Sequence, residues 1–378
     1  MKTTDVVVVG GGPGGLAVSQ QLTACNIPHV VLERGDHPAW MWDHVYDSLR
    51  LHTGKHLSSL PGMSFPSNTS LFPTRSEFTA YLHYYAEKSK LPVHTGIEAT
   101  GLRREKESWF VETSGTHYRA RIVVVATGIM SSPFLPAFTG MEVYGGQLFH
   151  STEYRRPETC PGQSILVIGI GNSAAEIASE LAASGREVTV SVRSGAAVIP
   201  RTIAGIPSQY FGWGISWLPG SVQRQVVQST ARLGGLLHRR QATLPRKGDA
   251  GPCQDVPVVG HTIVNHITAG RIKLRPGIAD FPEDTVRFND RSAWQGDTVV
   301  LATGYRSAIE WMGEYGARDG CGFALRKDRV RSAHHDGLYF VGHNYDGRGG
   351  LYNIRIDAKR IARQVARNLR KMKVGESP

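Results

Sequence analysis

Short apolar runs recur along the chain, and two of them lead directly into a helical pattern. Val6–Val9 precede a stretch in which Leu16, Ala17 and Leu22 recur at helical spacing, and Ile165–Ile168 precede a second such stretch. A buried strand that turns directly into a helix is typical of βαβ units with a parallel sheet. The pattern therefore predicts an α/β fold with two Rossmann-like dinucleotide-binding domains.

The turn after the first strand carries the fingerprint Gly10-x-Gly12-x-x-Gly15. The first glycine permits a tight turn, the second lets a pyrophosphate approach the backbone, and the third lets the helix pack close to the strand. The next strand, HVVLER, ends in Glu33, where an acid would bind a ribose hydroxyl. An adenine dinucleotide is predicted here, and the terminal position with its acid matches an FAD site.

A second fingerprint, Gly169-x-Gly171-x-x-Ala174, has alanine in its third position. The following strand, EVTVSVRS, ends in Arg193, at the place where the first unit has Glu33. An arginine there suits the 2′-phosphate of NADPH, although an arginine at a strand end can also be an ordinary surface residue. The two fingerprints together predict FAD and NADPH as cofactors.

Two further apolar strands end in the same Ala-Thr-Gly tripeptide, at 122–128 and 298–305. They bracket the second fingerprint, and we interpret them as the crossings where the chain leaves and re-enters the FAD domain. The expected FAD domain is therefore discontinuous, with residues 1–150 and 301–378. The NADPH domain, 151–300, is inserted and carries a helical, aromatic-rich insert at about 203–250.

The C-terminal part adds one more strand, Leu338–Val341, which ends in Gly342 before a glycine-rich loop and a helical stretch at 355–373. The N-terminus of that helix is a candidate to face a phosphate or the flavin ring. Its arginines lie opposite an apolar stripe, which is typical of a core-packing helix with a solvated face. A surface for an anionic partner is the alternative.

Composition narrows the class of protein. The chain has 378 residues and a net charge of +11, but its basic residues are scattered and no nucleic-acid motif accompanies them. No apolar run is long enough to span a membrane, and no signal-peptide pattern is present. The four cysteines are far apart in the sequence, so we expect no disulfide framework and a cytoplasmic location.

Several catalytic motifs are absent from the sequence. Disulfide reductases with a similar plan require a redox CxxC pair, and this chain has none. HExxH is missing, the neighbouring His334 and His335 have no spaced partners, and no metal is predicted. No GxSxG elbow is present. The chemistry is therefore expected to come from the flavin, with the protein supplying orientation and a dry pocket.

The segment YGGQLFHSTEY (144–154) resembles the FxGxxxHxxx(Y/F) signature of class B flavin-containing monooxygenases, with Tyr144 in place of the leading Phe. The resemblance continues through YDSLRLHTGKHLSSLP (46–61), VRSGAAVIPR (192–201) and 257–305. It is closest to the YUCCA-type, indole-3-pyruvate monooxygenase-like branch and its bacterial relatives. Baeyer–Villiger enzymes carry Trp at the last signature position, so Tyr154 favours the flavin-containing monooxygenase branch.

The resemblance implies a reaction. NADPH reduces FAD, O₂ adds to give a C4a-(hydro)peroxyflavin, and one oxygen atom passes to a small organic substrate. Gly146 and His150 would lie at the linker between domains and help to place NADP(H). Mammalian members place an Asn over the flavin near the segment that reads LHTGKH here. His52 is thus a candidate catalytic residue, and a packing or FAD-contacting histidine is the alternative.

The predicted cofactor-binding residues are Gly10, Gly12, Pro13, Gly14, Gly15, Glu33, Arg34, Trp42, Arg50, His52, Ala126, Thr127, Gly128, Gly146, His150, Tyr154, Gly169, Gly171, Asn172, Ser173, Ala174, Arg193, Ala302, Thr303, Gly304, Tyr305 and Gly342.

Three questions stay open at this point. The substrate is either an α-keto acid such as indole-3-pyruvate or a soft nitrogen or sulfur nucleophile. A flavoprotein reductase or oxidase that passes electrons to a protein partner or to O₂ is an alternative function, and a non-catalytic NADPH-sensing module is a third. The aromatic stretch at 206–240, with Phe211, Trp213 and Trp217, lines a substrate tunnel, touches a membrane surface or forms its own small core. The oligomeric state is not predicted.

Overall fold

The chain forms two compact units in the computed structural model, which describes residues 1–375 except 215, 216, 220, 223, 224, 227, 228, 230–256 and 345. The first unit comprises Met1–His44, Thr53–Ser132 and Arg306–Pro378, and the second comprises Val45–His52 and Pro133–Tyr305. Each unit contains one large sheet with parallel strands at its centre. In each, one strand leads through a glycine turn into a helix, as the sequence pattern predicts.

The sheet of the first unit has the order β3-β2-β1-β6-β5-β4, and β19 also pairs with β6. The parallel strands are β1 (Lys2–Val9), β2 (His29–Leu32), β3 (Val93–His94), β6 (Tyr118–Val125) and β19 (Leu338–Phe340). An antiparallel hairpin, β4 (Ala99–Glu105) and β5 (Ser108–Thr113), extends one edge. The carboxyl ends of the parallel strands therefore meet along one edge of the sheet.

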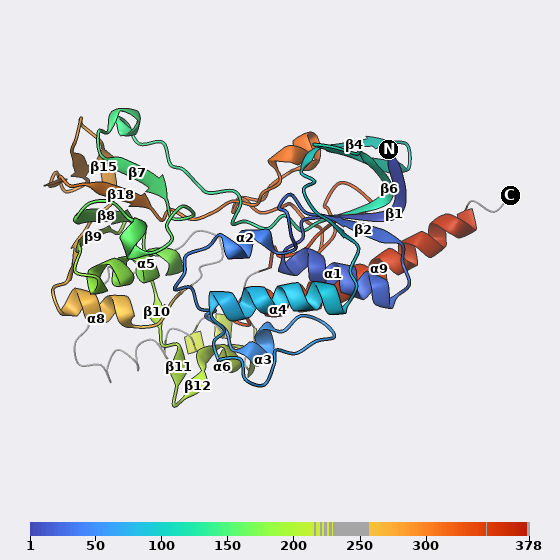
Figure 1. The fold of residues 1–378 in the computed structure, drawn as a ribbon, viewed down its shortest axis with the longest axis horizontal. Coiled ribbons are helices and arrows are strands. Elements are labelled where there is room, and N and C mark those ends of the chain that lie inside the picture. Colours follow the sequence, from blue (N-terminus) through green and yellow to red (C-terminus); the bar gives the residue numbers. More distant parts are fainter. Residues whose placement is uncertain are drawn as a thin grey trace. The chain divides into compact units, whose positions relative to one another are not determined.

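Helices α1 (Pro13–Ala24), α4 (Arg75–Lys88) and α9 (Gly350–Gly375) lie side by side in the first unit (Figure 1). The apolar stripe expected on the last helix is buried at Ala358, Ile361, Val365 and Leu369, so α9 packs against the core and exposes its charged face. The short elements of the unit are α2 (Trp40–Asp43), α3 (Lys55–Ser58) and η3 (Glu310–Tyr315).

All strands in the main sheet of the second unit are parallel, in the order β14-β9-β8-β18-β7. They are β7 (Gln147–His150), β8 (Ser164–Ile168), β9 (Glu187–Ser191), β14 (Ile272–Arg275) and β18 (Thr298–Leu301). Short pairs and a small antiparallel sheet complete the unit: β10 (Val198–Ile199), β13 (Val258–Val259), β11 (Thr202–Ile203), β12 (Ile206–Pro207), β15 (Ile278–Asp280), β16 (Val286–Phe288) and β17 (Ala293–Trp294).

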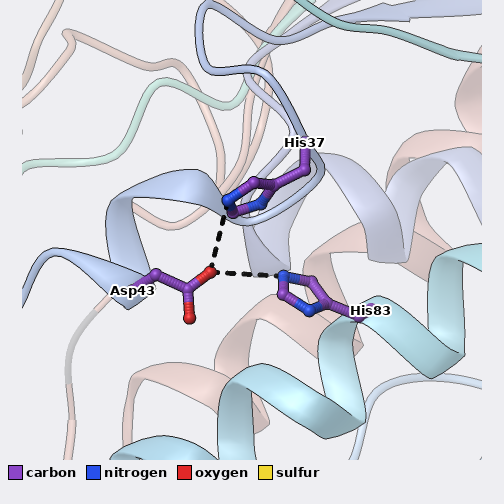
Figure 2. A group of neighbouring side chains, drawn as sticks. All are labelled: His37, Asp43 and His83. Carbon is purple, nitrogen blue, oxygen red and sulfur yellow. Dashed lines mark ion pairs between the residues drawn. The ribbon is translucent and has the colours of Figure 1, made fainter.

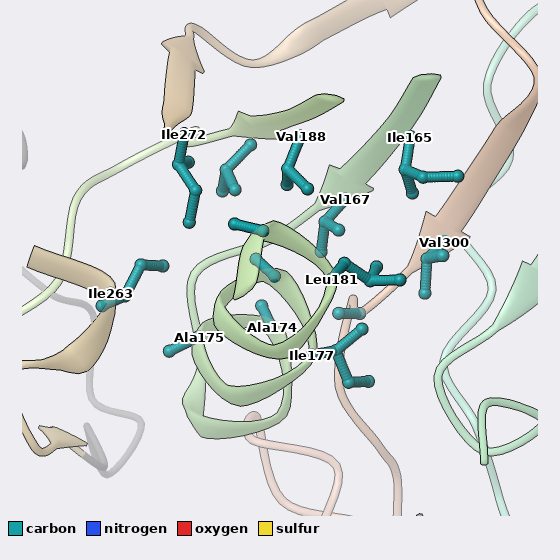
Figure 3. Packing of buried hydrophobic residues seen from close by; sticks show 14 of the residues in the cluster. Ile165, Val167, Ala174, Ala175, Ile177, Leu181, Val188, Ile263, Ile272 and Val300 are labelled. Atoms are coloured by element: carbon teal, nitrogen blue, oxygen red, sulfur yellow. The ribbon is translucent and has the colours of Figure 1, made fainter. Parts of the chain in front are cut away.

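The two faces of β8 pack into different cores, because successive side chains of a strand point to opposite faces. Ile165 and Val167 lie against α5 (Asn172–Ala183), whose Ile177 and Leu181 are fully buried between the strands and the helix (Figure 3). Leu166 and Ile168 pack on the other face with residues of the small antiparallel sheet. The remaining elements are α6 (Ser208–Gly214), α8 (Thr262–Thr268), η1 (Met141–Val143) and η2 (Pro157–Thr159).

The division into units differs from the boundaries expected at 150/151 and 300/301. The reason is that β18 pairs with β7 on one side and with β8 on the other, so both belong to the sheet of the second unit. The second Ala-Thr-Gly motif therefore ends a strand of the second unit. Residues 45–52 also group with that unit, which the sequence pattern did not indicate.

The aromatic insert is described only in part. Its first part forms β11, β12 and α6, and Phe211, Trp213 and Trp217 are exposed by 44%, 50% and 80%. Most of the segment after residue 219 lies outside the described residues. Within the part of the chain that is described, no helix combines the length and the apolar character that a membrane crossing requires.

Candidate functional site

The first glycine turn is shaped by close packing at two of its glycines. Gly10 has a φ of +108° and donates its N–H to the Leu32 carbonyl at 2.8 Å. A Cβ atom on Gly10 would lie 2.5 Å from the Ala126 oxygen, and one on Gly15 would lie 1.8 Å from the Gly10 oxygen. Strand, helix and neighbouring strand thus approach so closely that only glycine fits at these two positions.

Gly12 lies in open space by contrast. A Cβ atom there would meet nothing within 4 Å, and no side chain caps the start of α1. The first N–H groups of a helix have no partner within the helix and attract an anion. Pro13 begins the helix, with the buried Gly14 and Gly15 behind it. This cradle has the space and the polarity that the pyrophosphate of FAD requires.

Glu33 is held at the carboxyl end of β2 with 8% exposure. Its two carboxylate oxygens accept the N–H groups of Gly11 and Gly35, each at 2.8 Å. Each oxygen keeps lone-pair capacity for a hydroxyl donor, so the residue suits a ribose. The exposed Arg34 lies over the Trp40 ring, and Trp42 packs edge-on against Phe78 of α4. Trp42 thus packs α2 against α4, and its contact with FAD stays a prediction.

The first Ala-Thr-Gly motif follows β6 and forms one wall of the cradle. The hydroxyl of Thr127 donates to the Ala308 carbonyl at 2.6 Å, and the Ala308 N–H donates to the Gly128 carbonyl at 3.0 Å. Gly342 follows β19 with a φ of +83°. The ends of four parallel strands thus bring Gly10, Glu33, Ala126 and Gly342 to one edge, where ligands of open α/β sheets bind.

The second glycine turn repeats this geometry in the second unit. A Cβ atom on Gly169 (φ +121°) would lie 2.4 Å from the Ala302 oxygen, whereas one on Gly171 would meet nothing within 4 Å. Ala174, in the first turn of α5, is fully buried in the core. Ser173 follows Asn172 in the first turn of α5, and the Asn172 amide bonds the backbone of Pro257 and Val259. This cradle fits a second pyrophosphate.

The second Ala-Thr-Gly motif lies beside the second glycine turn, as the first one lies beside Gly10. The hydroxyl of Thr303 donates to the Phe134 carbonyl at 2.5 Å, and the Phe134 N–H donates to the Gly304 carbonyl at 2.9 Å. Tyr305 then pairs with Pro133 in an isolated bridge. In each unit, therefore, an alanine carbonyl lies close to the first glycine of the turn. The threonine after that alanine donates a hydrogen bond to a backbone carbonyl of the same unit.

Arg193 lies two residues beyond the end of β9 and is exposed. It makes no hydrogen bond or ion pair with any other described residue. With no partner among the described residues, its guanidinium is a candidate to bind a phosphate at the carboxyl edge of the sheet, next to β8. The cradle and this cation together fit NADPH.

The signature residues lie within the second unit. Gly146 precedes β7 beside the Tyr144 ring, and His150 ends β7 with 3% exposure. Burial lowers the pKa of His150, and the nearby Gly304 carbonyl and Glu153 oppose part of that shift. Its Nε2 atom is buried and forms no well-aligned hydrogen bond among the described residues. His150 is thus a buried side chain at the end of β7, and its contact with NADP(H) stays a prediction.

Tyr154, the last signature residue, is buried in the core with 1% exposure. Its hydroxyl donates to Glu180 of α5 at 3.0 Å, and burial raises its pKa well above the usual value. This hydroxyl has a partner within the second unit, and the cofactor contact predicted for Tyr154 stays a prediction.

His52 belongs to a partly buried polar cluster that the sequence did not reveal. Tyr46 donates a short hydrogen bond to Glu176 of α5, and Arg201 lies 3.3 Å from the same carboxylate. The Nδ1 atom of His52 is 3.9 Å from Glu176 Oε1. Burial, and then Arg201, lowers the pKa of His52 to about 4, while burial raises the pKa of Glu176. His52 is therefore neutral at physiological pH.

A cavity of about 270 Å³ adjoins this cluster in the second unit. The exposed Arg50 lines it with Glu176, Arg201 and His266. The motif YDSLRLHT supplies Tyr46, Arg50 and His52, but its neighbours in space come from α5 and from residue 201. The pairing with Glu176 depends on tertiary contacts. In the sequence, therefore, only the resemblance of that motif to the family pointed to this cluster.

Comparison with known proteins places both glycine turns in a family. Residues 7–201 match the model of the pyridine nucleotide-disulphide oxidoreductases. The indole-3-pyruvate monooxygenase YUCCA1 of Oryza sativa subsp. japonica is 32% identical over 95% of this chain and 90% of its own length. An uncharacterized CzcO-like oxidoreductase of Geobacillus kaustophilus is 32% identical over 92% of each chain.

Solved structures share the fold over nearly the whole chain. A flavin-containing monooxygenase from Stenotrophomonas maltophilia has a TM-score of 0.77 at 24% identity, with 98% of this chain and all of the other covered. The bacillithiol disulfide reductase Bdr of Staphylococcus aureus has a TM-score of 0.71 at 17% identity, with 97% and 99% covered. At these identities the likeness shows the fold alone. The sequence relatives decide the family: the chain belongs to the flavin-dependent monooxygenases that include the indole-3-pyruvate monooxygenases, and it is an FAD-dependent enzyme that uses NADPH.

Proposed function

We propose that the enzyme takes hydride from NADPH and inserts one atom of O₂ into a small α-keto acid such as indole-3-pyruvate. The observation that carries the NADPH part is the pair of open glycine cradles with opposite charges beside them, Glu33 after β2 and Arg193 after β9. A carboxylate accepts ribose hydroxyls and repels a 2′-phosphate, whereas a free guanidinium attracts it.

The substrate class rests on the curated relatives. Several carry the name indole-3-pyruvate monooxygenase at 30–34% identity over 95–98% of this chain. An α-keto acid would be cleaved oxidatively, with one oxygen atom entering the new carboxylic acid and the other leaving as water, while the original carboxylate leaves as CO₂. An amine or a sulfide is the second substrate class to test.

The residues of the chain have separate tasks in this reaction. The α1 and α5 N-termini bind the two pyrophosphates, Glu33 positions the FAD ribose, and Arg193 selects NADPH over NADH. Bound FAD supplies the electron transfer and the activation of O₂. We propose His52 as a neutral hydrogen-bonding residue of this site, because its lowered pKa keeps one nitrogen protonated and the other bare across the physiological range.

Turnover of one organic substrate at a time under ¹⁸O₂ tests this function. The purified enzyme with FAD is supplied with NADPH and indole-3-pyruvate, and NADPH consumed, acid formed and H₂O₂ released are counted together. We expect one labelled oxygen atom in the carboxylic acid and little H₂O₂. Amine and sulfide substrates are run in parallel.

Each other outcome overturns part of the proposal. Oxygenation of an amine or sulfide, without turnover of the keto acid, would replace the substrate class. Stoichiometric H₂O₂ with every substrate would favour the reductase or oxidase function. A protein that binds both cofactors and never consumes NADPH would be a sensing module.

A further inference from the structure

Three side chains that no part of the proposed reaction uses converge in the first unit. His37 lies in the loop after β2, Asp43 ends α2, and His83 lies in α4 (Figure 2). One oxygen of Asp43, Oδ2, lies 3.6 Å from His37 Nε2 and 3.4 Å from His83 Nε2. The three ligand-type atoms all lie within 4.8 Å of one another.

The separations of Asp43 Oδ2 from the two imidazole nitrogens are close to those between ligands of one tetrahedral ion. Bonds of about 2.0–2.2 Å to nitrogen and oxygen place two ligand atoms about 3.3–3.5 Å apart. A direct imidazole–carboxylate hydrogen bond would be shorter and would point nitrogen at oxygen. Neither imidazole makes such a bond to Asp43, and the Nε2 atom of His83 is buried without any hydrogen-bond partner among the described residues.

The His37 ring is oriented by a second contact. Its Nδ1 atom lies 3.1 Å from the Pro38 carbonyl, which can only accept, so Nδ1 carries the proton. In the neutral ring this leaves a lone pair on Nε2, the nitrogen that faces Asp43. Metal-bound histidines have this arrangement, in which the outer nitrogen donates to a carbonyl and fixes the tautomer.

We propose that His37, Asp43 and His83 bind a divalent transition-metal ion such as Zn²⁺. Two imidazoles and one carboxylate make a zinc-type donor set, which leaves a fourth position for water or for Asp36. The carboxylate of Asp36 lies 3.4 Å from His37 Nε2, and its side chain is 84% exposed and so free to turn. The histidine and aspartate side chains of the set are 33–42% exposed, which leaves the ion a route of entry.

The ion would connect two segments that are otherwise distant in sequence. His37 and Asp43 belong to the stretch that begins just after Glu33, and His83 belongs to α4. Binding would hold this stretch against the helix, so it would stabilise the first unit without taking part in electron transfer. This departs from the absence of metal expected from sequence, where His37 and His83 are too far apart to form a motif.

Zinc binding to the FAD-loaded full chain, with any affinity tag removed, tests the site. Isothermal titration with ZnCl₂ and metal analysis after gel filtration are expected to give one equivalent per chain. His83→Ala and His37→Ala should each weaken binding by more than the roughly 10–100-fold typical of losing an outer-shell partner. His334→Ala, which removes an exposed imidazole elsewhere in the same unit, should bind like the wild type.

His83→Asn keeps a polar side chain in α4 and guards against misfolding. It should retain the FAD content and circular dichroism of the wild type and still lose zinc. The proposal is overturned if the wild type takes up no zinc at micromolar concentrations. It is also overturned if His83→Asn and His334→Ala bind zinc equally, since the three residues would then be only an ion-paired cluster.

Discussion

Glu33 and Arg193 each follow the strand that comes after the glycine-turn helix of their unit, but their charges are opposite. Glu33 is fixed by two backbone N–H groups, whereas Arg193 has no partner among the described residues. A fixed acid suits hydroxyl groups of defined position, and a free, flexible cation suits a phosphate with three equivalent oxygens. At the scale of single residues, this difference distinguishes the two nucleotides.

Arg193→Ala should therefore weaken the binding of NADPH and leave the binding of NADH nearly unchanged. A lost charge-assisted contact costs roughly 1.5–3 kcal/mol, which corresponds to roughly a tenfold to hundredfold rise in the KM for NADPH. Steady-state kinetics with NADPH and with NADH measure the two KM values. Arg271→Ala is a matched control, because Arg271 is also exposed but precedes β14, at the opposite edge of the sheet. Equal losses for NADPH and NADH would contradict the assignment.

The pKa of the buried residue His343 is lowered mainly by its burial. It is 2% exposed, its Nδ1 accepts the Ala324 N–H at 3.2 Å, and its Nε2 lies 3.4 Å from the Ser307 hydroxyl. Burial, and then Arg326, lowers the pKa of His343 from 6.5 to about 3. The unfolded chain therefore binds a proton that the folded chain does not, and the free energy of unfolding falls as the pH falls from 6.5 towards 3.

Replacing His343 by Asn should flatten this pH dependence. The slope contributed by one such histidine is at most about 1.4 kcal/mol per pH unit. Asn can still accept the Ala324 N–H through Oδ1, so the readout is the slope rather than the absolute stability. Urea unfolding at a series of pH values measures this slope. His334→Ala, which removes an exposed histidine, is the control. An unchanged slope in the Asn variant would show that His343 is not the group responsible.

The elements of the two units follow one plan of strand, glycine turn and helix, but they are stabilised differently. Helix α1 and helix α5 begin without a side-chain cap, which leaves their N–H groups to a ligand. Helix α4 begins with a capping box, in which Thr74 and Glu77 satisfy each other's backbone N–H groups. The uncapped starts of α1 and α5 thus differ from the start of α4, whose first N–H groups are already satisfied by side chains.

Thr74→Ala should destabilise the first unit by about 1 kcal/mol, because it removes an N-cap acceptor from α4. Chemical unfolding followed by circular dichroism measures the loss. Ser76→Ala, a neighbouring change within the first turn, is expected to have a smaller effect. If Thr74→Ala lowered the free energy of unfolding no more than Ser76→Ala, the capping box would contribute nothing measurable.

At the scale of the whole molecule, each unit contains a complete glycine cradle of its own. Gly12 and Gly171 have φ values of −76° and −73°, so alanine is allowed by the backbone at both. A methyl group there would meet no protein atom within 4 Å and would project into the space assigned to a pyrophosphate. The two cofactor sites should therefore be separable by single substitutions.

Gly12→Ala should lose bound FAD while the fold is kept, and Gly171→Ala should keep FAD while the KM for NADPH rises at least about tenfold. Flavin absorbance per chain and NADPH kinetics measure the two effects. Gly15→Ala is the contrasting variant, because its methyl group would collide with the Gly10 oxygen and should reduce folding itself. Equal loss of FAD in both cradle variants would contradict separate sites.

Local patterns account for much of the fold and of the candidate cofactor residues. The strands before Gly10 and Gly169, the helices after them, and the acid and the arginine that follow are all readable from spacing of four to about twenty residues. The domain boundaries were less accessible, because β7 joins the sheet of β8 only through β18, more than a hundred residues later. The role of Tyr154 also depended on a distant partner, Glu180 in α5.

The sequence by itself determined the family, the two nucleotide fingerprints and the charge beside each, because glycine turns and strand-end residues act within a single strand–turn–helix unit. Only the tertiary structure showed that each Ala-Thr-Gly motif presses its alanine carbonyl on the first glycine of its own unit. Only there do Tyr46, His52, Glu176 and Arg201 form one partly buried cluster, and only there do His37, Asp43 and His83 meet. The physical reason is that burial, pKa shifts and ligand geometry depend on distances between segments, which close packing sets and local periodicity does not encode.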